Sequence, residues 1–442
     1  MTQKLPSLND AYLSRMERLL QEEYPVYLRC LQEPPVKAVR VNTLKHANTV
    51  LEGFDMVPSG FAENSWIIRN DTKLGGTAAY LSGTLYPQEP SASLPVTALG
   101  IREGMRVLDL CAAPGSKSTQ IAELLNHTGL LVCNEVVRKR SEVLRENIER
   151  HGISNAVVLN STPAKIASSF GAWFDAVLVD APCSGEGMFR KEADAVAMWS
   201  EENILFCAKR QREILNEAAK CVKPFGTLVY STCTFSEEEN EENVLSFLAS
   251  HPEFELVGIH GKGHYGTELL PKADMVRRVY PMDGGEGQFA ACFRKRGEEE
   301  KAASLPLLKS DPVPSCVRTF FETEMTGSFP YLLVHKEQVY GGTHPFTDCR
   351  GNSLLRHQVL LGFVRAGRFE PSHALALCAY TQLKQQTDLD EEETERYRRG
   401  ETIRKPCPKG WTAVRSKGFV IGLAKSDGMI LKNHYPKSFR IR

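Results

Sequence analysis

The stretch that decides the fold is Val107-Leu-Asp109-Leu-Cys111-Ala-Ala-Pro-Gly115-Ser-Lys117-Ser-Thr-Gln120. Its apolar start is typical of a buried strand, its middle of a tight turn, and its end of a helix. Small residues let a ligand approach the backbone, and the first turn of a helix offers free N–H groups to a carboxylate. The alternative is a plain tight turn without a ligand. The pattern predicts a binding site at the turn, formed by Cys111, Ala112, Ala113, Pro114, Gly115, Ser116 and Lys117.

Strands and helices alternate around this stretch, from about residue 91 to residue 297. Short apolar runs mark the strands at Met105–Leu110, Leu130–Cys133, Ala156–Leu159, Ala176–Val179 and Thr227–Tyr230. The clearest helix runs from Ile204 to Val222, with Ser200 placed to cap it. This alternation predicts an α/β domain with a doubly wound, mostly parallel sheet.

An acidic residue indicates which ligand the turn binds. Glu135 follows Gly115 by twenty residues and ends the second predicted strand, where a carboxylate can accept hydrogen bonds from ribose hydroxyls. The turn is neither Gly-x-Gly-x-x-Gly nor a P-loop, so it lacks the features of phosphate binding. A ligand with a ribose and an amino-acid carboxylate but no phosphates fits best, and S-adenosylmethionine is that ligand.

The composition excludes several classes of protein. The 442 residues carry 54 Lys and Arg against 54 Asp and Glu, and the longest apolar runs have strand length, so no membrane span is predicted. The N-terminus lacks the apolar core of a secretory signal. The 12 cysteines are irregularly spaced without a Cys-x-x-Cys pair, and the 11 histidines are scattered, so neither a disulfide framework nor a metal site is expected. We expect a monomer in a reducing cytoplasm.

Two further regions flank the α/β domain. Residues 1–90 read as an α+β extension, a mostly helical start followed by short strands, which would support the core or bind RNA. Arg294–Lys301 reads as a charged linker to residues 298–442, which end in a small β module from about residue 385. Between Glu401 and Arg442 there are 10 Lys or Arg and 2 acids. Such a basic module indicates nucleic acid, or a plain solvated tail.

Two cysteines follow strand-like runs in Asp180-Ala-Pro-Cys183-Ser-Gly and Tyr230-Ser-Thr-Cys233-Thr. Two thiols at the ends of two strands suit chemistry on a pyrimidine ring. Such a ring is activated when a nucleophile adds to it, and a thiolate is the best available side chain for that covalent step. The alternative, a small buried hydrophobe, suits the cysteines in helical patterns, namely Cys30, Cys207, Cys221 and Cys378.

Four stretches carry a family resemblance: DLCAAPGSKSTQ (109–120), NEVVRKR (134–140), DAPCSGEGMFRK (180–191) and YSTCTFSEEENEENV (230–244). Together they resemble the RNA cytosine-5 methyltransferases of the RsmB/NSUN type. Val39–Lys45, Tyr86–Ser93 and Tyr280–Ala290 add to the match, which spans roughly residues 35 to 295. The Glu-Gly-Met-Phe-Arg extension and a PUA-like, RNA-binding tail resemble the 16S rRNA methyltransferase F branch.

The resemblance implies a Rossmann-like class I methyltransferase fold with a C-terminal β-rich PUA-like module. It implies that Cys233 attacks C6, that Cys183 assists product release, and that Asp180 hydrogen-bonds the cytosine ring near N3. It assigns S-adenosylmethionine to the Cys111–Lys117 turn, Glu135, Arg140 and Asp180, with Glu135 on the ribose. The implied partner is ribosomal RNA or the small ribosomal subunit.

The chain departs from the family pattern at two places. Asn160-Ser-Thr162 stands where many relatives have an Asp, which leaves the adenine contact open. The common Lys-Pro-Gly-Gly turn is Lys223-Pro-Phe-Gly here, and we interpret it as a loop variation without catalytic weight. The Glu237–Glu242 run is interpreted as an N-terminal charge cluster on the next helix.

Two alternative functions remain: the same reaction on tRNA, and a non-catalytic RNA-binding assembly factor. An N-methyltransferase would carry Asn/Asp-Pro-Pro-Tyr/Phe where this chain has Asp180-Ala-Pro-Cys183. The target base must be unstacked to reach a thiol. Candidate RNA contacts, each with plain surface charge or packing as the alternative, are Arg40, Lys45, Arg190, Lys191, Trp411, Arg415 and Phe419.

Overall fold

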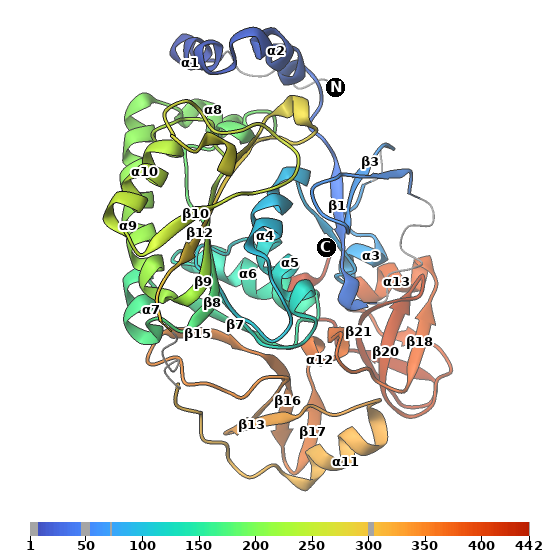
Figure 1. Cartoon of the computed structure of the whole chain (residues 1–442). Helices are drawn as coiled ribbons and strands as arrows, with labels where there is room; N and C mark the ends of the chain where they lie inside the picture. The colour runs from blue at the N-terminus through green and yellow to red at the C-terminus, as the bar shows by residue number, and fades with distance from the viewer. Residues whose placement is uncertain (1–7, 46–53, 71–72, 299–304, 442) are drawn as a thin grey trace.

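The computed structural model describes residues 8–45, 54–70, 73–298 and 305–441. Its centre is a nine-stranded sheet with helices on both faces (Figure 1). The middle strands run parallel, and the strands at both edges pair antiparallel. The order is β10 (Phe254–Val257), β12 (Gln288–Lys295), β9 (Val222–Thr232), β8 (Phe174–Asp180), β5 (Arg106–Asp109), β6 (Leu130–Asn134), β7 (Ala156–Asn160) and β15 (Ser353–His357), with β11 (Arg277–Val279) on β12. The predicted doubly wound α/β fold is confirmed.

The central strands are apolar throughout because both faces of the sheet are covered. Leu108 packs into the core on one face and its neighbour Val107 into the core on the other, and both are fully buried. The first face is covered by α7 (Pro163–Phe170), α9 (Glu201–Cys221) and α10 (Glu241–Ser250). The second is covered by α4 (Leu94–Leu99), α5 (Ser116–Leu125) and α6 (Arg138–Arg150).

The cap of α9 is as predicted. Its N-cap Ser200 accepts a hydrogen bond from the Asn203 N–H at 3.0 Å, and two glutamates occupy the first turn. The helix ends at Cys221, and β9 begins at once with Val222. The helical pattern of Ile204 to Val222 is therefore confirmed to within one residue.

The N-terminal region adds a small antiparallel sheet and two helices. The sheet order is β2 (Met56–Pro58), β3 (Ser65–Ile68), β1 (Ala38–Val41) and β4 (Leu85–Pro87), followed by α3 (Ala78–Leu81) at its side. Helices α1 (Asp10–Leu20) and α2 (Tyr24–Gln32) lie at the top of Figure 1. Tyr12 and Met16 of α1 are buried in one cluster with Phe189 and Trp199, beside α8 (Ala193–Met198).

The C-terminal region is rich in strands, as predicted. One sheet has the order β13 (Tyr331–His335), β14 (Gln338–Gly342), β16 (Val359–Arg365) and β17 (Arg368–Pro371). The last sheet has the order β18 (Gln386–Leu389), β20 (Gly410–Ser416), β21 (Phe419–Ser426), β22 (Ile430–Asn433) and β19 (Ile403–Arg404). The helices of this region are α11 (Ser315–Glu324), α12 (His373–Leu377) and α13 (Glu391–Arg398).

The C-terminal region packs against the rest of the chain at several places. Strand β15 extends the central sheet by pairing with β7, an addition that the sequence did not predict. The last sheet lies beside the N-terminal strands (Figure 1), where Ala78 and Leu81 of α3 pack against its core. Of the predicted linker Arg294–Lys301, the first two residues belong to β12 and the last three lie outside the described residues. None of the helices in the described ranges has the length and apolar character of a membrane span.

Candidate active site

A cavity of about 1110 Å³ opens at the carboxyl ends of β5, β6 and β8. This end of an open parallel sheet is where ligands bind. The cavity brings together most of the predicted site residues, namely Cys111, Ala113, Pro114, Ser116, Lys117, Glu135, Arg140, Asp180, Cys183 and Cys233. Ala112 is buried behind the turn, and Gly115 shapes the turn with a φ of 112°.

The two predicted catalytic thiols lie in contact. Strands β8 and β9 are adjacent and parallel, so the loops that follow them meet, and the Sγ atoms of Cys183 and Cys233 lie 3.3 Å apart. The hydrogen bond with Cys233, together with burial, raises the pKa of the Cys183 thiol well above its usual value. Cys183 therefore keeps its proton beside the Cys233 sulfur.

A partly buried ion pair lies next to the thiols. The Lys117 ammonium donates to Asp180 Oδ2 at 2.8 Å, and the Ser231 hydroxyl donates to Asp180 Oδ1 at 2.7 Å. Burial alone lowers the pKa of Lys117, but the charge of Asp180 and the hydrogen bond to it outweigh burial and raise this pKa. The Lys117 side chain, predicted only as part of the cofactor turn, is thus a cation held against the predicted catalytic carboxylate.

Buried Glu239 holds the loop of Cys183 in place. Its carboxylate accepts hydrogen bonds from the Ser184 N–H at 3.0 Å and from the Gln211 side chain at 2.7 Å. Gln211 also donates to the Pro182 carbonyl at 3.0 Å, which fixes the loop from both sides of the cysteine. Burial raises the pKa of Glu239 despite these bonds.

A second buried carboxylate, Glu186, joins the two cysteine loops. It accepts from the Trp199 indole N–H at 2.8 Å, from the Thr234 hydroxyl at 2.8 Å and from the Phe235 N–H at 2.7 Å. Thr234 and Phe235 directly follow Cys233, so the carboxylate fixes that loop to the segment after Cys183. Sequence reasoning missed this anchor.

The Glu237–Glu242 run lies at the N-terminus of α10, as predicted, but its middle residues are buried. Glu239, Asn240 and Glu241 are 0% exposed. Glu241 forms an ion pair with buried Arg278. Their position in the sequence could have indicated this burial. The acids directly follow the Cys233 motif, in the turn between strand β9 and helix α10.

The cofactor half of the cavity has donors and acceptors in suitable places. Helix α5 has no side-chain cap at Gly115, so the N–H groups of its first turn remain open to a ligand. The Glu135 side chain, 3% exposed, accepts from the Val137 N–H at 2.8 Å. Arg140 donates to the Ala113 carbonyl at 2.8 Å and lies 3.3 Å from Glu135, which ties the turn to the acid.

The departure at Asn160 has a structural role. The Asn160 side chain donates to the carbonyls of Glu135 and Val136, at 2.7 and 2.8 Å. It therefore fixes the loop that carries the ribose-binding candidate. Val136 is 56% exposed and, together with Pro163, offers an apolar surface in the cavity. Open N–H groups, an acidic acceptor and apolar walls fit a nucleoside that carries an amino-acid carboxylate.

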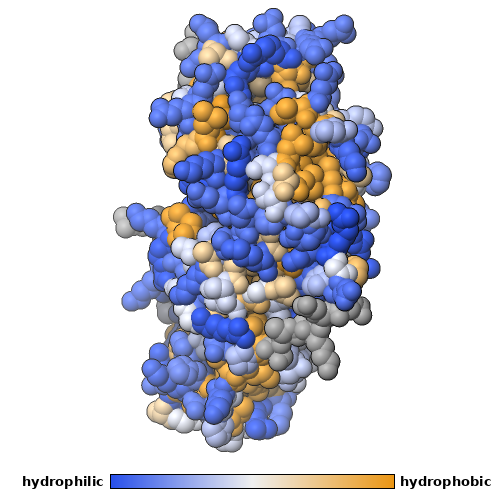
Figure 2. All heavy atoms as spheres, turned by 60° about the vertical axis from the view of Figure 1, so that its left-hand side comes forward, coloured by the Kyte–Doolittle hydropathy of each residue, from blue (hydrophilic) through white to orange (hydrophobic). Residues whose placement is uncertain are grey.

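The rim of the cavity is apolar on α8 and α9. Met198, Leu205 and Phe206 are 70%, 60% and 61% exposed, and the Arg210 guanidinium lies 5.1 Å from the centre of the Phe206 ring. Met198 and Arg210 line the cavity itself. Figure 2 brings this side of the molecule forward and shows apolar side chains gathered in its upper half.

The expectation of phosphate contacts was wrong for three basic residues. Arg40 is fully buried, forms an ion pair with Glu123 and donates to Gln88 Oε1 at 2.8 Å. Lys45 donates to the carbonyls of Ser82 and Arg150. These two join the N-terminal region to the α/β core.

The third of these residues, Arg190, pairs with buried Glu286 at 2.7 Å, and its side chain is 4% exposed. Lys191 remains a quarter exposed, 3.9 Å from the same glutamate. Basic residues near a motif thus mark interfaces between parts of the chain as well as RNA contacts.

Of the expected RNA clamp in the last module, the Trp411 ring is unavailable for stacking. Trp411 is 8% exposed and belongs to a hydrophobic core, and Phe419 packs against the N-terminal sheet. Arg415 pairs with Asp388 at 2.6 Å. Lys405 and Lys417 pair with glutamates of α13, so part of the basic surplus is neutralised. Within the described ranges, no group of three His, Cys, Asp or Glu side chains is arranged to hold a metal ion.

Three family models match the chain. The model for the 16S rRNA methyltransferase RsmB/F covers residues 96–294. The N-terminal domain of the 16S rRNA methyltransferase RsmF matches residues 8–90, and the methyltransferase RsmF PUA domain matches residues 384–441. The three matches follow one another along the chain without overlap.

Individual proteins agree with the models. Ribosomal RNA small subunit methyltransferase F of Vibrio vulnificus is 31% identical, with 97% of each chain covered. The protein of the same name from Citrobacter koseri is 40% identical over 65% of this chain and 63% of its own. A solved methyltransferase homolog protein from Pyrococcus horikoshii is 28% identical, with a TM-score of 0.58 over 65% of this chain and 95% of that one.

Proposed function

Because this chain belongs to the RsmB/F family of 16S rRNA methyltransferases, we propose that it methylates C5 of cytosine in small-subunit ribosomal RNA through a covalent adduct with Cys233. The cofactor is S-adenosylmethionine, which when bound supplies the methyl group from its sulfonium. The observation that carries the proposal is the contact of two thiols, 3.3 Å apart, beside a Lys117–Asp180 ion pair at the mouth of the cofactor cavity.

The first step is the addition of Cys233. Its thiolate sulfur forms a bond to C6 of cytosine, and the electron pair of the C5–C6 double bond moves toward C4 and N3, where a proton is taken up. Asp180 orients the ring at N3 and the 4-amino group. Lys117, bonded to Asp180 at 2.8 Å, is the nearest cationic proton donor. The addition makes C5 electron-rich enough to accept the methyl group.

The last step is release. Water takes up the C5 proton, the electron pair of the C5–H bond restores the C5–C6 double bond, and the S–C6 bond breaks to regenerate the Cys233 thiolate. N3 returns its proton to the Lys117–Asp180 pair. We assign assistance in this step to Cys183, since its thiol keeps its proton and lies against the departing sulfur. The target base must be unstacked from its neighbours before it can enter the cavity.

Ribosomal RNA is the favoured substrate because the relatives that match over their full length carry that name and because the tail matches a PUA domain. We propose residues 1–90 as a support or RNA-binding region, 91–297 as the catalytic domain and 298–442 as the RNA-binding region, acting as a monomer in the cytoplasm. The same chemistry on tRNA is the alternative substrate assignment, and a non-catalytic assembly factor is the alternative without chemistry.

The experiment that tests the adduct is the Cys183→Ala variant incubated with S-adenosylmethionine and small-subunit RNA. We expect an RNA–protein complex that survives a denaturing gel, because addition proceeds while release fails. The double variant Cys183→Ala/Cys233→Ala should form none, and Cys207→Ala, at a buried cysteine outside the cavity, should behave as wild type. Absence of a complex with RNA that the wild-type protein methylates would contradict the assignment of Cys183.

A further inference from the structure

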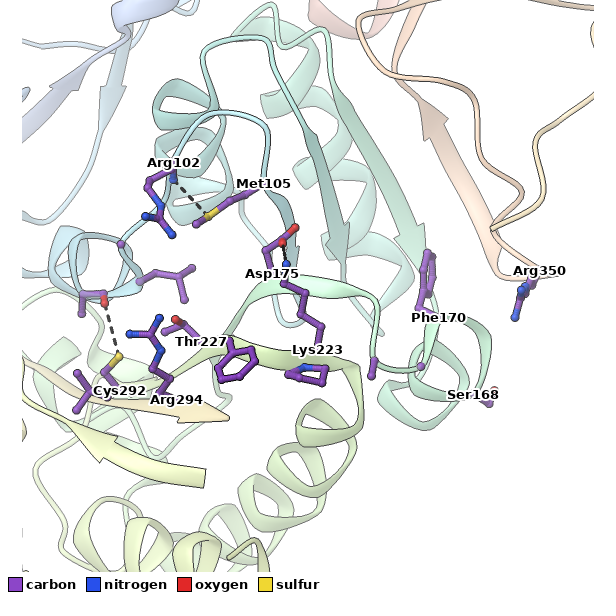
Figure 3. Close-up of a pocket in the computed structure, with 18 residues that line it drawn as sticks. Arg102, Met105, Ser168, Phe170, Asp175, Lys223, Thr227, Cys292, Arg294 and Arg350 are labelled. Carbon is purple, nitrogen blue, oxygen red and sulfur yellow. Dashed lines mark hydrogen bonds and ion pairs between the residues drawn. The ribbon is translucent and has the colours of Figure 1, made fainter. Parts of the chain in front are cut away.

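A second cavity, of about 1000 Å³, opens at the opposite end of the central sheet (Figure 3). Its lining includes Asp175 near the start of β8 and Met105 just before β5, whereas the catalytic cavity lies at the ends of these strands. Apolar walls come from Leu99, Phe170 and Val257. The catalytic proposal uses none of these residues.

A bulge in β9 projects into this cavity. Val222 pairs with Phe174 and Thr227 with Ala176, so four residues of β9 stand opposite the single residue Asp175 of β8. These four residues are Lys223-Pro-Phe-Gly226. From the sequence we interpreted this turn as a loop variation without a catalytic role. Three of them, Lys223 to Phe225, line the cavity. Bulges are common where a strand redirects a side chain toward a site.

The backbone conformation at Phe225 is unfavourable for a bulky residue. Its φ is 61°, in the left-handed region that glycine adopts freely and that is an outlier for a bulky side chain. Its side chain is also 49% exposed, so packing against the core does not compensate for the strain. A strained backbone that presents an exposed aromatic ring to a cavity is a feature of binding sites.

Three arginines line the same cavity. Arg102, from the loop before β5, and Arg294, from β12, lie on the same side of the cavity in Figure 3, while Arg350 lies at its far side. Arg350 donates to the Ser169 carbonyl at 3.1 Å. Among the described residues no carboxylate pairs with any of these three arginines. Asp175 cannot neutralise them, since it already pairs with Lys223 and with Arg106.

We propose that this second cavity binds an unstacked nucleotide of the RNA substrate, with the base on the Phe225 ring and phosphates on Arg102 and Arg294. An aromatic face beside guanidinium groups is the combination that holds single-stranded RNA. The proposal rests on the proposed function, because it assigns the nucleotide to the RNA that the catalytic end modifies. The same chemistry would suit a free nucleotide, and the test separates the two sources.

The test is binding of fluorescein-labelled hexauridylate to the full chain, followed by anisotropy. This oligonucleotide contains no cytosine, so it does not depend on methyl transfer. We expect Phe225→Gly to weaken binding about tenfold, the usual value of one base–aromatic contact. Because glycine suits a φ of 61°, the melting temperature of this variant should be no lower than that of wild type. Phe225→Tyr should retain binding.

The charge contribution has a matched control. Arg102→Ala/Arg294→Ala should weaken binding about tenfold and reduce its salt dependence, because phosphate contacts are lost. Arg138→Ala/Arg212→Ala removes the same charge from two exposed positions of the catalytic domain that line neither cavity, and it should bind as wild type. With 4-thiouridine in the oligonucleotide, ultraviolet light should link it to the peptide that contains Phe225.

Three results would overturn the proposal: wild-type affinity in both the Phe225→Gly and the double-arginine variants, cross-links only at other peptides, or Phe225-dependent binding of uridine monophosphate but not of hexauridylate. The last would assign the cavity to a free nucleotide. Failure here is distinguishable from failure of the catalytic proposal, because Cys233→Ala should still bind hexauridylate, and methylation of a cytosine-containing RNA is measured separately.

Discussion

The two ends of the central sheet are built in opposite ways. At the carboxyl end, charged side chains are partnered, as with Lys117 and Asp180, and Lys117 and Glu239 are also buried. At the amino end, Arg102 and Arg294 are exposed beside a strained Phe225. Chemistry requires groups held in fixed positions, whereas binding a flexible strand requires cations that are free to meet phosphates. The comparison favours Arg102 and Arg294 over the buried cations as the proposed RNA contacts.

The largest effect is expected at the carboxyl end. Cys233→Ala removes the nucleophile, so turnover should fall by more than about 10⁴-fold. Binding of S-adenosylmethionine, measured by calorimetry, should be unchanged because the cofactor half of the cavity is intact. Normal methylation by this variant would contradict the mechanism, and loss of hexauridylate binding would contradict the separation of the two ends.

The next effect concerns stability. Arg40→Met leaves Glu123 buried without its cation, so the free energy of unfolding should fall by about 3–5 kcal/mol. The control is Arg399→Met, which breaks an exposed pair with Glu395 and should cost less than about 1 kcal/mol. Urea denaturation measures both. Equal losses in the free energy of unfolding would contradict the inference that Arg40 links the N-terminal region to the α/β core.

Substitution of Glu239 tests whether this residue holds the Cys183 loop in its catalytic position. Glu239→Gln replaces an acceptor of several hydrogen bonds by an amide whose NH₂ meets the donors of Ser184 and Gln211. The displaced Cys183 loop should lower kcat about 100-fold, with the KM for RNA changed little. Glu242→Gln, at an exposed neighbour, should leave kcat unchanged. A change in KM alone would contradict a positioning role.

The smallest effect is a pH dependence. Burial lowers the pKa of Lys45 from 10.5 to about 7. Between these values the unfolded chain binds a proton that the folded chain has lost, so this residue makes stability rise with pH from about 7 to 10.5. Lys45→Met should flatten the rise in melting temperature across that window. Exposed Lys139→Met should preserve it, and identical pH profiles for all three proteins would contradict the burial of Lys45.

Local patterns predicted what depends on neighbours in sequence. The apolar runs predicted the parallel strands, and the small residues before Ser116 predicted the turn that begins α5. The positions of Cys183 and Cys233 after two strands placed both thiols at one cavity. Each of these follows from strand period and from the rule that parallel strands end at one edge.

Features that depend on side-chain burial or on the sign of φ were not predicted from the sequence. Arg40, Lys45 and Arg190 read as surface cations because charge alone does not say which side chains have buried partners. Strand β15 joins the sheet from nearly 200 residues further along than β7, a pairing that no local pattern encodes. Phe225 looked like a neutral replacement because the sequence does not reveal a positive φ.

The measurement that tests the central claim most directly is bisulfite sequencing of ribosomal and transfer RNA from cells with and without this gene. The account predicts that at least one protected cytosine in small-subunit ribosomal RNA becomes convertible when the gene is absent, and that Cys233→Ala fails to restore its protection. Loss of protection in tRNA alone would keep the chemistry and contradict the substrate. Unchanged protection in both RNAs would contradict the proposal that this chain is a cytosine-5 methyltransferase.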